Sequence, residues 1–233
     1  MANAPLIQSF PSPNFNERRE GAKPTLLVLH YTGMQSATAA LTRLCTPEAE
    51  VSAHYLVEED GRIHQMVEDN MRAWHAGIGS WRGMRDINSG SIGIEIVNPG
   101  HEFGYRPFPE IQMASVLWLS QKLVRQYEIL PVNVIGHSDL APGRKVDPGE
   151  LFDWEMLSKN GVGLWPIDDL DEPGSEVSFF ANLAFIGYDI TEPELVTAAF
   201  QRHWRQGEVS GKADTETRKC AASLRKQVEG LTN

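Results

Sequence analysis

The stretch TLLVLHYT, residues 25–32, contains four consecutive apolar residues followed by a histidine. An apolar run of this length is typical of a strand that is buried on both faces. Because side chains alternate along a strand, Leu26, Val28 and His30 lie on one face. A histidine at the end of a strand is held rigidly and still meets solvent, so His30 is a candidate ligand. It could equally be a core histidine that hydrogen bonds to the backbone, since histidine is intermediate in burial.

A second strand, SIGIEIVN at residues 91–98, has two different faces, because isoleucines alternate with Gly93 and Glu95. A carboxylate inside an apolar strand costs free energy unless it is paired or used in chemistry. We expect Gly93 to leave room beside Glu95 for a ligand or a water molecule. A buried ion pair is the alternative, because structural ion pairs also place carboxylates in such strands.

The remaining pattern predicts an α/β fold with a mixed central β-sheet flanked by helices. The strands are expected near residues 25–31, 53–58, 62–66, 92–97 and 132–136. Two helices, near 36–45 and 109–128, alternate with these strands and are expected to cover the sheet. The second of them carries apolar residues at helical spacing, which indicates one buried face.

The loop GHSDLAPGRKVDPG, residues 136–149, gathers a histidine, a lysine and an aspartate between glycines and prolines. Glycine and proline fix an irregular backbone, and a loop shaped in this way that carries such side chains is more often a site than a connection. His137 and Asp147 offer an imidazole nitrogen and a carboxylate oxygen, which are both good zinc ligands. Two ligands do not make a site, and His30 is the best candidate for the third.

Six motifs occur in a fixed order within residues 23–165: LHYT, SAHYLVEEDG, AWHAG, WRG, SIGIEIVNPG and GHSDLAPGRKVDPG. In this order they resemble the motifs of zinc-dependent N-acetylmuramoyl-L-alanine amidases, in the branch that includes peptidoglycan recognition proteins. The resemblance implies one Zn²⁺ per chain and a peptidoglycan or muropeptide as substrate. It also implies hydrolysis of the amide that joins the lactyl group of N-acetylmuramic acid to L-alanine of the stem peptide.

The resemblance assigns roles to residues by position. It implies His30, His137 and Asp147 as zinc ligands, Glu95 as general base and Lys145 as the group that stabilises the oxyanion. Three protein ligands leave one position of a catalytic zinc open. A carboxylate can take a proton from water and pass it to the leaving amine, and an ammonium group can meet the negative charge that develops in the transition state.

Further residues are expected to contact the substrate. The resemblance implies that Tyr55 of SAHY and His75 of WHAG line the binding groove. The segment 74–107 is rich in Gly, Trp and Arg and has few regular elements, and long loops of this kind in compact domains are usually functional or disordered. From this segment we expect Arg85 to meet a carboxylate of the stem peptide.

Two other functions compete with the amidase. One is a recognition protein of the same fold that holds a muropeptide without cutting it, but such relatives typically lack a zinc ligand and this chain keeps all three. The other is a zinc peptidase that acts on the stem peptide itself, which the order of the motifs disfavours. Intact cell wall and released fragments, such as anhydro-muropeptides, both stay open as substrates.

Composition narrows the partners and the compartment. The 233 residues suffice for one core and a small second domain, and the net charge of −10 argues against a nucleic-acid partner. No stretch approaches the roughly 20 apolar residues of a membrane span, so no membrane insertion is expected. The N-terminus lacks a signal-peptide pattern. We therefore expect a cytoplasmic location if the chain is complete, and a periplasmic one if a signal was removed. The oligomeric state stays open.

We expect four segments along the chain. Residues 1–22 form an extended arm, 23–165 the zinc amidase domain, 166–176 an acidic linker and 177–233 a helical domain. Three helices are expected in the last segment, which resembles the small peptidoglycan-binding domain of many cell-wall hydrolases. The motifs IGYDIT, AAFQRHW and ADTET carry this resemblance, whereas the usual glycine-rich turn is altered to GEVSGKAD. The alternative is a set of helices that only packs on the amidase.

Overall fold

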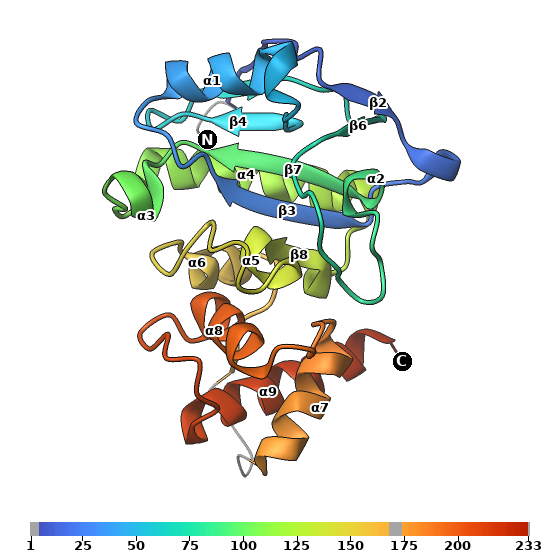
Figure 1. Ribbon diagram of the computed structural model, residues 1–233, viewed down its shortest axis with the longest axis vertical. Coiled ribbons are helices and arrows are strands. Elements are labelled where there is room, and N and C mark those ends of the chain that lie inside the picture. The colour runs from blue at the N-terminus through green and yellow to red at the C-terminus, as the bar shows by residue number, and fades with distance from the viewer. Residues whose placement is uncertain (1–4, 168–173, 233) are drawn as a thin grey trace.

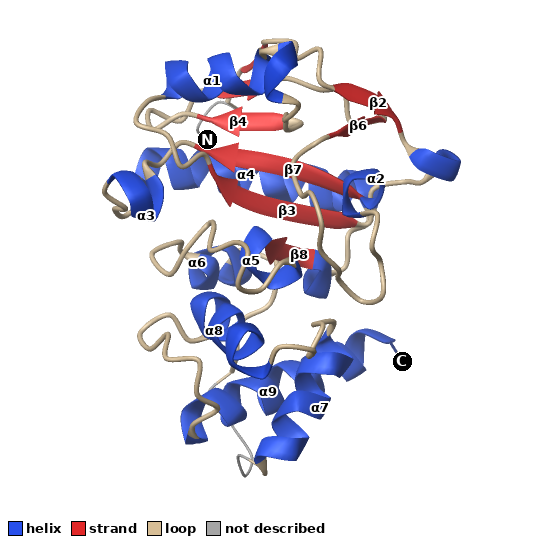
Figure 2. Ribbon diagram, in the orientation of Figure 1, coloured by secondary structure: helices blue, strands red, loops and turns tan. Residues whose placement is uncertain are grey.

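A six-stranded mixed sheet forms the centre of the protein in the computed structural model, which describes residues 5–167 and 174–232 (Figure 1). In spatial order its strands are β1 (Ile7–Ser9), β5 (Ile63–Gln65), β4 (Tyr55–Val57), β7 (Ser91–Ile96), β3 (Leu26–Tyr31) and β8 (Val134–Gly136). Among the described strands of this sheet, β4 and β5 pair antiparallel and the other neighbours pair parallel. The mixed sheet flanked by helices confirms the predicted fold class (Figure 2).

Strand alternation divides the core between the two faces of the sheet. On one face, helix α4 (Glu110–Tyr127) packs on Leu29, Ile94 and their same-face neighbours. On the other face, helix α1 (Ala37–Cys45) covers Leu56, and its first turn is capped by the Ser36 hydroxyl. In β3 and β7, His30 is in register with Glu95, so both side chains belong to this second face, as the alternation predicts.

Smaller elements complete the first two thirds of the chain. A two-stranded antiparallel sheet consists of β2 (Phe15–Glu17) and β6 (Met71–Ala73). The short helices are α2 (Ile87–Gly90), α3 (Gly100–Phe103), α5 (His137–Leu140) and α6 (Trp154–Lys159), with single 3₁₀ turns at Arg19–Gly21, Pro47–Ala49 and Pro131–Asn133. Within the described residues, no helix combines the length and the apolar character needed to cross a bilayer.

The N-terminal residues take part in both sheets. Strand β1 adds a parallel edge strand beside β5, and β2 pairs with β6. Arg18, which follows β2, is buried, and its guanidinium donates to the carbonyl oxygens of Asp69, Ser89 and Ser91. The segment expected to be an extended arm is therefore integrated into the fold from Ile7 onwards.

Three C-terminal helices follow, as expected: α7 (Glu176–Ile186), α8 (Pro193–Trp204) and α9 (Thr215–Thr232). They share one continuous apolar core with the sheet, in which Val28 and Trp81 belong to the same buried cluster as Phe179 and Phe200. Figure 1 shows α8 beside α5. The helices therefore pack directly on the part of the chain that forms the sheet. Most of the expected linker, residues 168–173, lies outside the described residues.

Candidate active site

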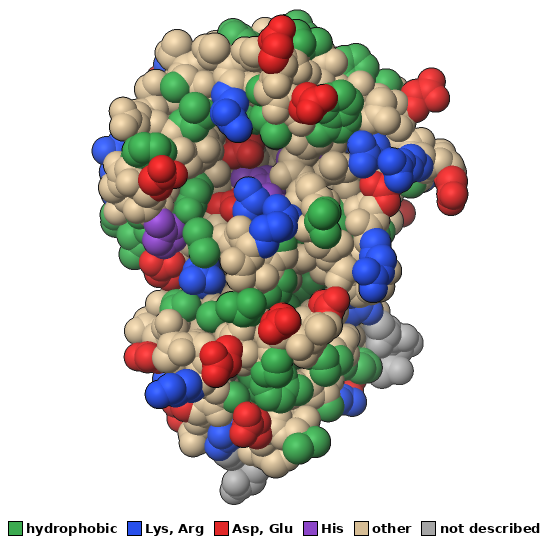
Figure 3. Space-filling view, viewed as in Figure 1, with side chains coloured by type: hydrophobic (Ala, Val, Ile, Leu, Met, Phe, Trp, Pro, Cys, Tyr) green, Lys and Arg blue, Asp and Glu red, His purple; other side chains and the backbone are tan. Residues whose placement is uncertain are grey.

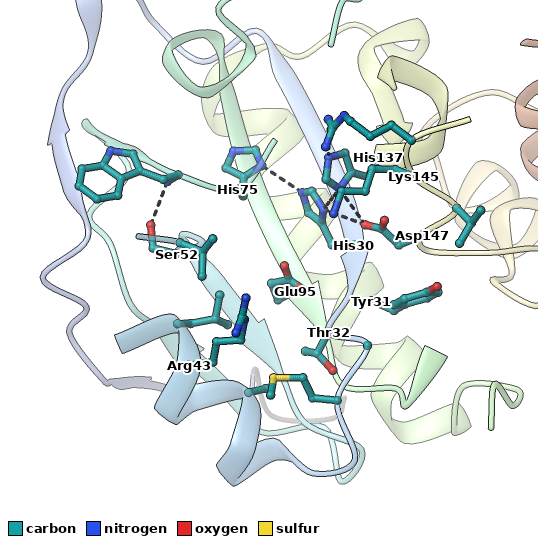
Figure 4. Close-up of a pocket in the computed structure, with 18 residues that line it drawn as sticks. His30, Tyr31, Thr32, Arg43, Ser52, His75, Glu95, His137, Lys145 and Asp147 are labelled. Atoms are coloured by element: carbon teal, nitrogen blue, oxygen red, sulfur yellow. Dashed lines mark hydrogen bonds and ion pairs between the residues drawn. The ribbon is translucent and has the colours of Figure 1, made fainter. Parts of the chain in front are cut away.

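Three side chains converge at one end of the sheet. His30 lies near the end of β3, His137 begins α5, and Asp147 follows the turn after α5. Nδ1 of His30 lies 2.9 Å from Nδ1 of His137, and Oδ2 of Asp147 lies 3.0 Å from each of these nitrogens (Figure 4). All three side chains are buried. The structure thus brings together the three residues that the motifs single out as ligands.

Hydrogen bonds fix the tautomer of His137. Its Nε2 lies 2.8 Å from the carbonyl oxygen of Ala76, which can only accept, so Nε2 carries the proton. The Nδ1 of the neutral ring is then a lone pair that points toward His30 and Asp147. A metal-binding histidine has the same arrangement, in which the second nitrogen donates to a carbonyl group.

A longer chain of hydrogen bonds fixes the tautomer of His30. The hydroxyl of Ser91 donates to the Ile87 carbonyl at 2.6 Å, so it accepts from Nε2 of His75 at 3.1 Å. Nδ1 of His75 is therefore an acceptor, and it takes the proton of His30 Nε2 at 3.0 Å. The Nδ1 of His30 is left as a second lone pair.

The electrostatics of the cluster favour a bound cation. Burial, followed by the neighbouring His137, lowers the pKa of His30 to about 4, so the ring is neutral near pH 7. Burial alone would raise the pKa of Asp147, but the two histidines lower it well below its ordinary value. Two lone pairs and a carboxylate in van der Waals contact repel one another unless a cation lies among them. The donor set therefore suits a metal ion.

Glu95 lies beside this cluster with an unused oxygen. Its Oε2 is shielded from solvent and has no hydrogen-bond partner among residues 5–167 and 174–232. Burial and, to a lesser extent, the charge of Asp147 raise the pKa of Glu95 well above 4.5, while Lys145 acts to lower it. An unpaired carboxylate with a raised pKa is poised to accept a proton from a group in the cavity.

A cavity of about 320 Å³ opens over these residues. Its lining includes the three clustered residues, Glu95, Lys145 and Trp74. Arg43 of α1 lies across the cavity from the cluster (Figure 4). In Figure 4 the side chain of Lys145 extends toward His30. On the face drawn in Figure 3, histidine and acidic side chains lie in a hollow that is flanked by Lys and Arg side chains.

Tyr55 lies outside the cavity, and the expectation that it lines the groove is wrong. In β4, Leu56 is in register with Glu95, so Tyr55, in register with Ile94, points to the opposite face. The Tyr55 side chain is buried against α4, and its hydroxyl donates to Asp69 at 2.8 Å. Tyr55 is thus a core residue with a satisfied polar end.

The space beside Gly93 is also used differently from the expectation. A Cβ atom on Gly93 would lie 2.5 Å from the ring of His75, so the missing side chain makes room for that ring and not for a ligand or water. His75 lines the cavity and holds the tautomer of His30. The sequence did not predict the contact between His75 and His30, because this contact exists only once the loop after β6 is folded over β7.

The cations of the cavity differ from the expected one. Arg85 is exposed and does not line the cavity. Its charge acts instead on Asp189, which lies between α7 and α8 in the C-terminal segment. Arg43 and Arg144 line the cavity instead. Arg144 braces the loop by donating to the carbonyl oxygens of Ala76 and Ile78. The side chain of Arg43 makes no hydrogen bond or ion pair within the described part of the chain, and its position on α1 could not be read from a local motif.

Comparison with known proteins agrees with this geometry. The family model "N-acetylmuramoyl-L-alanine amidase" matches residues 20–150, which span the cluster, Glu95 and Lys145. The chain belongs to this amidase family. The amidase shares 36% identity with N-acetylmuramoyl-L-alanine amidase AmiD of Escherichia coli, over 85% of this chain and 81% of that protein. It shares 35% identity with 1,6-anhydro-N-acetylmuramyl-L-alanine amidase AmpD of Enterobacter cloacae, over 63% of this chain and 86% of that protein.

Solved structures match most of the amidase, including its C-terminal helices. The E. coli AmiD structure, a complex with anhydro-N-acetylmuramic acid-L-Ala-D-gamma-Glu-L-Lys, has a TM-score of 0.79 at 33% identity and covers 92% of this chain and 98% of its own. The AmpDh3 structure from Pseudomonas aeruginosa, in complex with an anhydromuramic pentapeptide, has a TM-score of 0.82 at 29% identity and covers 90% and 94%.

Proposed function

We propose that this amidase hydrolyses the amide between the lactyl group of N-acetylmuramic acid and L-alanine of a muropeptide, with one zinc ion held by His30, His137 and Asp147. The observation that carries this proposal is the convergence of two Nδ1 lone pairs and a carboxylate beside the unpartnered oxygen of Glu95. Zinc in such a site supplies a Lewis acid that polarises a carbonyl group and lowers the pKa of water.

Glu95 acts in this proposal as the general acid and base. Its carboxylate accepts the proton of the attacking water and later passes it to the amine of L-alanine as the C–N bond breaks. The raised pKa of Glu95 supports this role, because the carboxyl group must hold the proton between the two steps. Glu95 lines the cavity, and its Oε2 has no hydrogen-bond partner within the described residues, so no protein donor holds that oxygen of the carboxylate.

Lys145 acts as the group that stabilises the oxyanion. Lys145 lines the same cavity as His30 and Glu95, and its side chain extends toward His30 (Figure 4). The backbone N–H of Lys145 donates to the Ala141 carbonyl at 3.0 Å, which anchors the loop behind the side chain. An ammonium group held in this way meets negative charge that appears only as the tetrahedral intermediate forms.

We propose an anhydro-muropeptide as the substrate class, since AmiD and AmpDh3 have been solved with such molecules bound. The γ-linkage of glutamate in the AmiD substrate leaves its α-carboxylate free, two residues beyond the lactyl carbonyl. Arg43 offers an unpaired cation on the wall of the cavity opposite the cluster. We propose that Arg43 binds this carboxylate.

The alternative is a recognition protein that holds the muropeptide without cutting it. The complete donor set and the free oxygen of Glu95 favour catalysis. The test is to incubate the zinc-loaded chain with a purified anhydro-muropeptide and to follow the products by mass spectrometry. Hydrolysis releases the free stem peptide and the anhydro-sugar, whereas binding alone leaves the muropeptide intact and detectable in complex with the protein.

A further inference from the structure

A buried hydrogen-bond network joins the C-terminal helices to α5, the short helix that begins at His137. Its centre is Asp139, whose side chain is fully buried. Oδ2 of Asp139 accepts from the backbone N–H of Gly136 at 2.8 Å and from Nδ1 of His203 at 2.6 Å, and Oδ1 accepts from the hydroxyl of Tyr188 at 2.5 Å. Two of the three donors therefore come from the C-terminal part of the chain.

These two donors are themselves held in place. The ring of His203 stacks between Trp154, at 3.8 Å, and Trp204, at 3.5 Å between ring centroids. Nε1 of Trp204 donates to the Tyr188 hydroxyl at 2.9 Å, so that hydroxyl keeps its own proton for Asp139. Aromatic stacking of His203 and the two hydrogen bonds of the Tyr188 hydroxyl leave these donors little freedom to move.

The carboxylate of Asp139 in turn holds the backbone that carries two of the clustered residues. Its bond to Gly136 fixes the first turn of α5, where His137 is the next residue. The backbone N–H of Ser138 donates to the carbonyl oxygen of Asp147 at 2.9 Å, so Asp147 is tied to the same turn. A shift of Asp139 would therefore move His137 and Asp147 together.

A buried carboxylate that loses a hydrogen-bond donor has no water molecule within reach to replace it. Either another donor must move toward the carboxylate or the carboxylate must shift, and both changes displace the first turn of α5, to which Asp139 is bonded. Metal sites respond strongly to such changes, because metal affinity falls when the groups that orient the ligands are altered.

We propose that His203 and Tyr188 are positioning residues for the metal ligands, so that the C-terminal helices complete the active site. This inference rests on the proposed function, in which His137 and Asp147 bind zinc. It gives the C-terminal helices a role that does not depend on cell-wall binding. The helices act through Asp139 and do not touch the reacting atoms.

The test compares zinc affinities of the full-length chain, freed of metal and titrated with zinc against a chromogenic chelator. His203→Asn keeps an N–H donor close to the position of Nδ1, whereas His203→Leu has a similar size and no donor, and both lose the stacked ring. Tyr188→Phe removes only the hydroxyl. Leu183→Ala is the control, because it opens a cavity in the same C-terminal core without touching Asp139.

We expect zinc affinity to fall about tenfold in His203→Leu relative to His203→Asn, to fall in Tyr188→Phe, and to stay at the parent value in Leu183→Ala. Thermal unfolding without zinc shows that each variant is folded. Parent-like zinc affinity in both Tyr188→Phe and His203→Leu overturns the inference alone, as does an equal loss in His203→Leu, His203→Asn and Leu183→Ala. A parent chain that binds no zinc overturns the proposed metal site, and this inference with it.

Discussion

The Nδ1 atoms of His30 and His137 lie 2.9 Å apart, and the Nε2–H group of each ring donates a hydrogen bond to a different partner. His137 donates to a backbone carbonyl, and His30 donates to His75. Both lone pairs therefore face the same point, next to a carboxylate oxygen of Asp147. The two histidines lie in different elements, and separate sets of hydrogen bonds orient both lone pairs toward the same point. This convergence is the strongest structural argument for a metal ion there.

Replacing Glu95 by Gln is expected to abolish most turnover while zinc content and fold are kept. The amide cannot take the proton of water, so kcat should fall by about 10²–10⁴-fold. Steady-state hydrolysis of an anhydro-muropeptide, with metal analysis of the same sample, checks this. Glu128→Gln, at an exposed position, is the matched control. Near-parent turnover in a folded, zinc-loaded Glu95→Gln variant would contradict the role of the base.

Lys145→Met keeps most of the side-chain volume and removes the charge. If Lys145 meets the oxyanion, kcat should fall by roughly 10²–10³-fold with little change in KM, because the contact strengthens only in the transition state. Lys159→Met, which removes an exposed lysine paired with Glu155, should have no effect. A Lys145→Met enzyme with a parent-like kcat would show that Lys145 does not stabilise the oxyanion.

Arg43→Gln should weaken substrate binding and leave the chemistry unchanged. Loss of one charge-assisted contact to a carboxylate is expected to raise KM about tenfold with kcat nearly constant. The decisive comparison uses a second substrate in which the α-carboxylate of glutamate is amidated. That substrate should be cut equally well by the parent and by Arg43→Gln. An equal loss on both substrates would mean that Arg43 does not read this carboxylate.

Buried His54 predicts acid sensitivity of the fold. Its Nδ1 accepts from the Gly93 N–H at 3.0 Å, and burial lowers its pKa from 6.5 to about 3. Below pH 6.5, His54 binds a proton in the unfolded chain but not in the folded chain, so the free energy of unfolding falls as the pH falls. This group alone should reduce the free energy of unfolding by about 2 kcal/mol between pH 7 and pH 5. Urea unfolding of the parent and of His54→Gln measures it, and equal losses in both proteins would contradict the prediction.

Local sequence patterns predict most residues of the candidate site, but they do not predict which neighbouring residues line the cavity. The alternation of TLLVLHYT and SIGIEIVN places His30 and Glu95 on faces that the observed register confirms. The expectation for Tyr55 came from the resemblance, which gives no strand register. The face of a short strand depends on its register with its neighbour, and a shift of one residue inverts it. A motif alone carries no such register.

Contacts between distant segments could not be predicted from the sequence. The bond from His203 to Asp139 spans 64 residues, and nothing in AAFQRHW indicates that its histidine faces the catalytic loop. The three helices of the C-terminal segment could be expected from the sequence. That they share a core with the sheet depends on the shape of both surfaces, since apolar faces alone do not specify a partner.

The central claim is that His30, His137 and Asp147 bind one zinc ion that the reaction requires. The most direct measurement is the zinc content of the purified chain, by mass spectrometry of the metal, for the parent, His30→Ala, His137→Ala and the control His101→Ala, at an exposed position. One zinc per chain is expected in the parent and in His101→Ala, and almost none in the other two. Stoichiometric zinc in both His30→Ala and His137→Ala would contradict the assignment.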